Sequence, residues 1–186
     1  LEGFVQDGRV EDADDLRTLL ETYLCNQVGT ADLVALRAAH AAAVADNLDG
    51  IRYADRRLAA VTLAAEFRES AERSGARLLS LQRDLGTGPL LERYAAHVED
   101  VDAPGHHAAV LGAAAVVAGV DERPACLVCC HGFVTGLLGA GQRLLSLGHT
   151  DVQRVLDDLR PAIRDAVEDS ATRTLDGMTS FTPLVD

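Results

Sequence analysis

The chain has 186 residues and a formal net charge of −12, because 29 acidic side chains outnumber 17 basic ones. At this length we expect one domain that buries most of its apolar surface without disulfide bonds. A protein that neutralises nucleic-acid phosphates needs a basic face, so the acidic balance excludes DNA and RNA as main partners. The chain has no tryptophan and one methionine, so its core must come from leucine, valine and alanine.

No uncharged apolar run reaches the roughly 18 residues that a membrane span needs, and the nearest, 108–120, is too short. Residues 1–9 lack the basic leader and the apolar core of a signal peptide. Three of the four cysteines crowd into 126–130, which does not resemble a secreted disulfide framework. These features predict a cytoplasmic protein with no membrane association.

The first part of the chain carries apolar residues at helical spacing. Leucine and tyrosine recur every three or four residues in 10–28, behind aspartates that suit the positive end of a helix dipole. Gly29 is expected to end this helix, and Thr30 to cap a second one that continues to Ala45. The sequence therefore predicts two helices with a break at Gly29.

A long third helix is expected to open at Asp49 or Gly50, with opposite charges three and four residues apart along its surface. Ser74–Gly75 is expected to interrupt this helix, after which leucines continue a helical pattern to Gly86. Pro89 suits the first turn of a further short helix that ends near His97.

Two segments rich in small residues form the predicted centre of the fold. Residues 106–119 are almost wholly apolar, and 125–147 have the same character, with glycines that would let neighbouring backbones approach: Gly132, Gly136, Gly139 and Gly141. Thr150 is expected to cap one more helix, and Pro161 either begins another or kinks it. No segment alternates as a strand does, so the sequence predicts an all-α, single-domain helical bundle with two central small-residue-rich helices.

The densest group of potential metal ligands is Cys126, Cys129, Cys130 and His131. Thiols and an imidazole bind zinc, nickel or copper. On a helix, however, His131 points away from the face that the cysteines share, and no second pair of ligands completes a set of four. Free cysteine is also a frequent core residue. The sequence therefore favours a packed cluster without metal, and a small metal-binding or sensor module using 126–131 stays as the alternative.

Catalytic machinery is not recognisable in the sequence. His106 and His107 are adjacent, so on a helix they face different directions and are not expected to share an ion. The carboxylates of 12–15 fit a solvated face. The chain has no nucleophile elbow, no P-loop and no dinucleotide-binding motif. A helical enzyme of unrecognised type is therefore disfavoured, and no cofactor is expected.

Several short strings, in order along the chain, resemble the urease accessory protein UreF family. Leu1-Glu2 with Gly8-x-Val10 is similar to the family's opening Gly-Leu-Glu…Gly-x-Val. The helix that contains Glu66-x-Arg68 runs into Gly75-x-x-Leu-Leu, as an Arg- and Glu-rich helix does in the family. His106 with Gly112 is similar to the His…Gly of the core helix that follows.

The best signature lies in the last third of the chain. Arg143-Leu-Leu-Ser-Leu-Gly-His…Gln153 is similar to the family's basic-x-x-Pro-Leu-Gly-Gln…Gln, with Ser146 in place of proline and His149 in place of glutamine. The final string, Thr182-Pro-Leu-x-Asp, resembles the family's Ser-Pro-Leu-x-Asp. Five strings in the family's order are far more specific than any one of them.

The resemblance implies that residues 1–186 form a single all-helical UreF-like domain that lacks the family's N-terminal and C-terminal ends. It implies a chaperone of urease maturation that is not an enzyme. Such a protein links the GTPase UreG to UreD, also called UreH, and to apo-urease, so that GTP hydrolysis is coupled to nickel insertion. These proteins are usually homodimers, and their work depends on complementary surfaces.

By match to these strings, the predicted partner-binding residues are Glu2, Arg143 and Gln153, with Arg68 and Arg73 as second choices. Each has a structural alternative. Arg143 would also stabilise the negative end of a helix that ends nearby, and Arg68 and Arg73 would also form surface ion pairs. No catalytic residue and no metal ligand is predicted.

Overall fold

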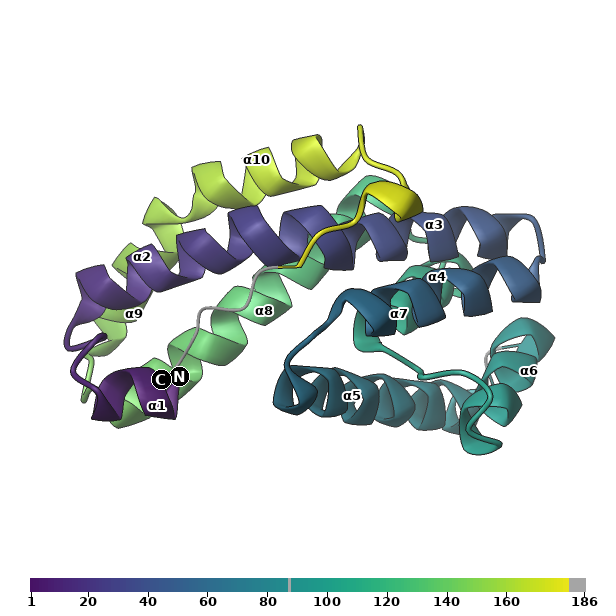
Figure 1. Ribbon diagram of the computed structural model, residues 1–186, viewed down its shortest axis with the longest axis horizontal. Coiled ribbons are helices and arrows are strands. Elements are labelled where there is room, and N and C mark those ends of the chain that lie inside the picture. The colour runs from purple at the N-terminus through teal and green to yellow at the C-terminus, as the bar shows by residue number, and fades with distance from the viewer. Residues whose placement is uncertain (87, 181–186) are drawn as a thin grey trace.

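The computed structural model describes residues 1–86 and 88–180, and within these ranges the chain is helical and has no strand (Figure 1). The all-α fold class is thereby confirmed. In chain order the elements are α1 (Glu2–Gln6), α2 (Ala13–Tyr23), η1 (Leu24–Asp32), α3 (Leu33–Val44), α4 (Leu48–Val61), α5 (Ala65–Asp84), α6 (Gly88–Glu99), α7 (His107–Val117), α8 (Glu122–Leu144), α9 (His149–Asp158), α10 (Arg160–Ser170) and η2 (Leu175–Gly177). η1 is a π-helix and η2 is a single 3-10 turn.

α2, η1 and α3 form one continuous helical run (Figure 1). The predicted break at Gly29 is wrong, and the role of this glycine is different. A Cβ atom on Gly29 would lie 3.2 Å from the Cα of Ala166, so glycine permits close packing between η1 and α10. The run passes this point as a π-helix, a form that is rare and frequent at functional sites.

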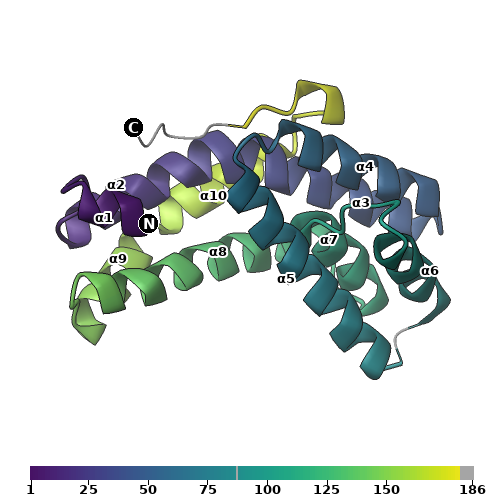
Figure 2. The same ribbon diagram turned by 60° about the horizontal axis from the view of Figure 1, so that its bottom comes forward.

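α5 likewise runs straight through Ser74–Gly75, where the sequence predicts an interruption. The break falls earlier, at residues 62–64, between α4 and α5. There the hydroxyl of Thr62 donates a hydrogen bond of 2.9 Å to the carbonyl of Leu58, and Arg68 donates one of 2.8 Å to the carbonyl of Thr62. From this corner α5 crosses α7 at a steep angle (Figure 2).

α7 is a central helix, as its composition predicts. Most of its residues are buried, and they pack against α3, α4 and α5. A Cβ atom on Gly112 would lie 2.3 Å from the carbonyl oxygen of Leu36 in α3, so the two backbones are in direct contact there. Small residues at the centre thus allow helices to approach more closely than larger side chains would permit.

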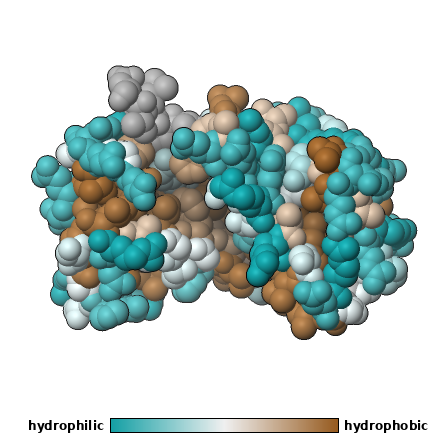
Figure 3. All heavy atoms as spheres, turned by 90° about the horizontal axis from the view of Figure 1, so that it is seen from below, coloured by the Kyte–Doolittle hydropathy of each residue, from teal (hydrophilic) through white to brown (hydrophobic). Residues whose placement is uncertain are grey.

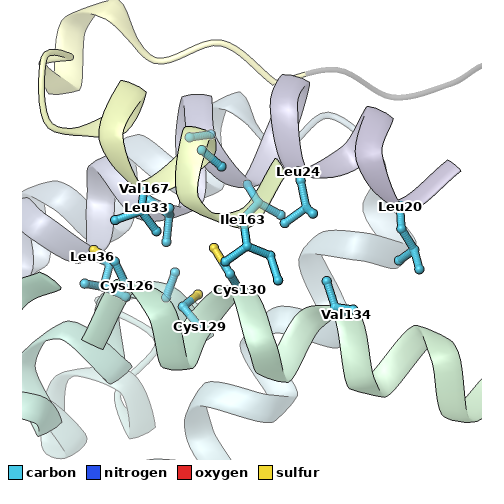
Figure 4. Close-up of a cluster of buried hydrophobic side chains, with 14 of the residues drawn as sticks. Leu20, Leu24, Leu33, Leu36, Cys126, Cys129, Cys130, Val134, Ile163 and Val167 are labelled. Carbon is cyan, nitrogen blue, oxygen red and sulfur yellow. The ribbon is translucent and has the colours of Figure 1, made fainter. Parts of the chain in front are cut away.

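One side of α8 lies in the core against α2, η1, α3 and α10 (Figure 4). The buried side chains that α8 contributes are mainly Cys126, Cys129, Cys130, Val134 and Leu138. They meet leucines of the long α2–α3 run and apolar residues of α10, including Ile163 and Val167. The three crowded cysteines therefore act as small apolar core residues.

The other side of α8 is open. The helix is long and apolar enough to span a membrane by length and composition, with a mean hydropathy of 1.5 in its most apolar window, yet only 39% of that window is buried. Gly132, Gly136 and Gly139 would each place a Cβ atom in open space, and Gly141 alone among the four is crowded, 2.4 Å from Leu16. The prediction that all four glycines bring backbones together is therefore wrong for three of them.

α9 and α10 follow one another with almost no linker. α9 begins at His149, and the backbone N–H of Gly148 donates to the carboxylate of Asp151 at 3.2 Å, whereas the sequence predicts a cap at Thr150. Pro161 lies in the first turn of α10, which begins at Arg160, so a new helix forms here and not a kink. Arg37 of α3 donates to the carbonyl of Val167 at 2.7 Å and so fastens α10 to the core.

Candidate functional site

A groove runs between α5 and the open side of α8, and its two halves meet at Leu137. The outer pocket, of about 560 Å³, is lined by Leu1, Glu2, Gly3, Gln6, Glu66, Leu137, Ala140, Arg143 and Leu144. The inner pocket, of about 480 Å³, is lined by Gln27, Val28, Asp32, Phe67, Ser70, Ala71, Ser74, His106, His107, Ala108, Cys129, Gly132, Phe133, Gly136 and Leu137. Figure 3 shows this side of the molecule hollowed near its middle, with hydrophobic walls.

The outer pocket brings together Glu2 and Arg143, two of the predicted partner-binding residues from opposite ends of the chain. Both side chains are exposed, and neither has a side-chain hydrogen bond or an ion pair with any described residue. Glu66, at the start of α5, lines the same pocket. A surface with charged groups that make no contacts within their own chain is suited to binding another protein.

The other predicted residues lie elsewhere. Gln153 is exposed on α9 and lines neither pocket of the groove. Arg68 is engaged in the α4–α5 corner through its hydrogen bond to Thr62, and Arg73 lies 3.7 Å from Glu69 in an exposed ion pair. The structure therefore brings two of the five residues together and gives Arg68 and Arg73 contacts within the chain.

The inner pocket contains polar groups that sequence reasoning does not single out. The π-helix η1 supplies Gln27, which is 9% exposed, and Asp32. The Oε1 atom of Gln27 and the Nδ1 atom of His106 are buried and have no hydrogen-bond partner among the described residues. Burial raises the pKa of the Asp32 carboxyl to about 7. Of these residues, only His106 had a sequence signal, through the family string that pairs it with Gly112.

A buried carboxylate holds His106 in place. Asp55 of α4 is fully buried and accepts hydrogen bonds from the backbone N–H of Gly105 at 2.7 Å and of His106 at 2.8 Å. The hydroxyl of Tyr94 in α6 donates a third, at 2.8 Å. Burial and the neighbouring imidazole of His107 lower the pKa of His106 to about 4, so its ring is neutral at pH 7.

The cysteine cluster does not converge on a metal site. Cys126, Cys129 and Cys130 are buried, whereas His131 is exposed. Burial raises the pKa of Cys126 to about 11 and that of Cys130 to about 12, and it raises the pKa of Cys129 well above its usual value. A metal binds the thiolate form, which these values disfavour. Within residues 1–86 and 88–180, no three His, Cys, Asp or Glu side chains are placed to hold a metal ion.

The groove also offers no activated nucleophile among its described residues. The hydroxyl of Ser74 donates to the carbonyl of Ser70 at 2.8 Å, within its own helix. The Cys129 thiol is protonated at neutral pH for the reason given above. The groove is concave and contains unpaired polar groups, and these features are typical of a site that binds another molecule.

Comparison with known proteins agrees with the family that the ordered strings indicate. A family model described as UreF matches residues 10–160. The chain belongs to the UreF family. It is 34% identical to the urease accessory protein UreF of Trichodesmium erythraeum, covering all of this chain and 80% of that protein. It is 32% identical to the urease accessory protein UreF 2 of Brucella suis, over all of this chain and 76% of the relative.

The family strings can now be placed on the UreF fold. Arg143 lies in the last turn of α8, and the string that it begins continues through the α8–α9 turn to Gln153. Ser146, which replaces proline, has a φ of 53°, a value that a proline ring cannot adopt. This turn therefore differs from one built on proline. The string at 182–186 lies outside the described residues.

Proposed function

We propose that this UreF-family chain is a non-enzymatic accessory protein of urease maturation in the cytoplasm. It links the GTPase UreG to UreD, also called UreH, and to apo-urease, and it couples GTP hydrolysis to the insertion of nickel. Nickel is the cargo of this process, and the chain itself needs no cofactor. Neither nucleic acid nor a membrane is a partner.

The observation that carries this proposal is the open groove beside α8. Its outer pocket joins Glu2 and Arg143, whose charges are not used within the described part of the chain. Charged groups that stay free on one protein steer and orient a complementary partner. The inner pocket is mainly apolar, and the burial of its surface under a partner would favour binding.

The proposal includes a homodimer. α8 and α10 form a second, mainly apolar pocket of about 560 Å³, which includes Leu127, Val128 and Ile163. Val128 is 57% exposed. An exposed apolar patch of this kind is typical of a protein–protein interface. Sedimentation of the purified chain tests this part: a monomer at micromolar concentration would contradict it.

Replacement of Arg143 by alanine tests the function. We expect Arg143→Ala to keep the helical circular-dichroism spectrum, to reduce the amount of UreG and UreD that co-purifies, and to lower urease activation in cells. Arg123→Ala is the matched control, because Arg123 is also exposed on α8 but lies at the other end of the helix, outside the groove.

Equal activation with Arg143→Ala and Arg123→Ala would remove Arg143 from the interface. The whole proposal fails if a strain that lacks the chain still makes fully metallated urease when nickel is limiting. Glu2→Ala and Gln153→Ala, measured in the same assay, test the other two predicted residues.

A further inference from the structure

The inner pocket is asymmetric in charge, because it contains a carboxyl group and no arginine. Most of the residues that line it are apolar or small, and no arginine lines it. Asp32 is the one residue that lines it and can carry a negative charge. Asp32 is half-buried, and its carboxyl is hydrogen-bonded to its own backbone N–H but has no ion pair with any described residue. A carboxylate in an apolar setting is costly unless a cation or hydrogen-bond donors compensate it.

Two further polar atoms in the inner pocket have no hydrogen-bond partner among the described residues. Gln27 is only 9% exposed, and its Oε1 atom, a hydrogen-bond acceptor, has no donor among the described residues. The neutral ring of His106, which is 3% exposed, has an unpaired Nδ1 atom. Buried polar groups in folded proteins are nearly always paired. Two unpaired atoms, together with a carboxyl that no basic residue neutralises, therefore point to a ligand that donates hydrogen bonds.

We propose that the inner pocket receives an apolar segment of a urease-maturation partner and that one lysine or arginine of that segment reaches Asp32 and Gln27. An ammonium group has three N–H donors and a guanidinium has five, and neither accepts. The apolar walls, which include Phe67 and Phe133, would cover the rest of the segment. For the identity of the partner, this inference rests on the proposed function.

The charge of the chain suits a partner segment with a basic residue, because a chain with a net charge of −12 attracts such a segment. The homodimer proposed above uses a different surface, the mainly apolar pocket of α8 and α10. The inner pocket is also open to such a segment, since a Cβ atom on Gly132 or Gly136 would meet nothing within 4 Å.

Filling the pocket tests the docking. In Gly136→Leu the new side chain occupies the inner pocket, and in Gly139→Leu it occupies open space on the same helix outside the pocket. Each variant of the 186-residue chain is co-expressed with UreG, UreD and apo-urease from the same organism, and the amount of each that co-purifies with the chain is measured. We expect at least about a tenfold loss for Gly136→Leu and no loss for Gly139→Leu, because only the first blocks a binding site.

Equal retention by the two variants would overturn the inference. If Gly136→Leu instead abolished self-association measured by sedimentation and left partner retention unchanged, the occupant would be a second copy, which also overturns it. Loss of partners in Arg143→Ala together with full retention in Gly136→Leu would leave the proposed function standing and remove this inference alone.

A small probe tests the chemistry without any partner. We expect 4-phenylbutylamine to bind the purified chain at least about tenfold more tightly than 4-phenylbutanol, since only the amine brings a cation to the carboxylate. Asp32→Asn should abolish this difference while it leaves the melting temperature equal or higher. Equal binding of amine and alcohol to the unmodified chain would overturn the inference, even where partners co-purify. Preference for the amine in a chain that retains no maturation protein would support the pocket chemistry and contradict the proposed function.

Discussion

Gly75 of α5 lies so close to Gly105 that a Cβ atom on Gly75 would stand 1.9 Å from the carbonyl oxygen of Gly105. No side chain fits there, and the same Cβ atom would lie 3.0 Å from the backbone nitrogen of His107. The glycine thus allows α5 to pack directly on the start of α7. This contact also fixes the wall of the inner pocket, because Ser74 and His107 both line it.

Alanine at position 75 is therefore expected to destabilise the fold. Gly75→Ala forces α5 away from α7, and overpacking of this kind costs about 1–3 kcal/mol. Gly136→Ala should have the opposite effect, a gain of about 0.5–1 kcal/mol, because alanine favours the helix and its Cβ atom meets nothing within 4 Å. Urea denaturation of both variants measures the two changes.

The pair of variants separates two roles of glycine within helices. Helix propensity alone would stabilise both variants to a similar degree. A stabilised Gly75→Ala variant would contradict the close contact with Gly105, and a strongly destabilised Gly136→Ala variant would contradict the open side of α8.

The fold class and most helices were predictable from the sequence because they depend on local spacing. The failures at Gly29 and Gly75 have one cause. A glycine that ends a helix and a glycine that admits a neighbouring helix look the same in sequence, and only the position of α10 or of Gly105 distinguishes them. The three open glycines of α8 show the converse, since whether a small residue faces a neighbour depends on tertiary packing.

The buried carboxylate of Asp55 is expected to be a major contributor to stability. Asp55→Ala leaves the N–H groups of Gly105 and His106 and the hydroxyl of Tyr94 without their acceptor. Each buried donor left unsatisfied costs about 1–3 kcal/mol, so the loss of all three hydrogen bonds should cost clearly more than the loss of one. Tyr94→Phe removes only one of the three donors and should cost about 1–2 kcal/mol.

Thermal denaturation of the two variants checks this order. Similar, small losses for Asp55→Ala and Tyr94→Phe would mean that the Asp55 carboxylate does not hold the loop before α7. Amide hydrogen exchange at Gly105 and His106 gives a second readout, since both amides should exchange faster in Asp55→Ala.

Asp32 should make the stability depend on pH in the opposite direction to an ordinary aspartate. Its pKa is raised to about 7 in the folded chain from 3.8, so the folded state binds more protons than the unfolded state between about pH 4 and pH 7. The contribution of Asp32 to stability is therefore greatest in acid and declines as the pH rises through this window. Asp32→Asn removes that decline.

The difference in unfolding free energy between Asp32→Asn and the unmodified chain is expected to grow in favour of the variant by about 1–3 kcal/mol from pH 4 to pH 7.5. His106 acts in the opposite sense, because its lowered pKa makes stability fall as the pH drops from about 6.5 to about 4. That effect is present in both proteins and cancels in the difference. A difference that stays constant with pH would show that Asp32 is not held in an apolar setting.

The candidate site was only partly accessible from the sequence. Glu2, Arg143 and His106 were named through short family strings; in the fold Glu2 and Arg143 line the outer pocket and His106 lines the inner one. Gln27 and Asp32 were not named, and nothing in the sequence placed them near His106, because their proximity depends on how α5 packs on α7 and on how η1 packs beside α8. Sequence spacing carries no information about residues that meet through such crossings.

Thiol reactivity distinguishes the packed cysteine cluster from an accessible one. Cys25 is exposed, whereas Cys126, Cys129 and Cys130 are buried with raised pKa values, so thiolate formation and reagent access are both suppressed there. We expect a disulfide reagent such as Ellman's reagent to modify one thiol in the native chain and all four in denaturant. Burial also raises the pKa of Cys25, so its reaction should accelerate between pH 7 and pH 9. In Cys25→Ser the fast phase should disappear, and a native chain that still lost two or more thiols rapidly would contradict the packing of α8 against η1 and α10.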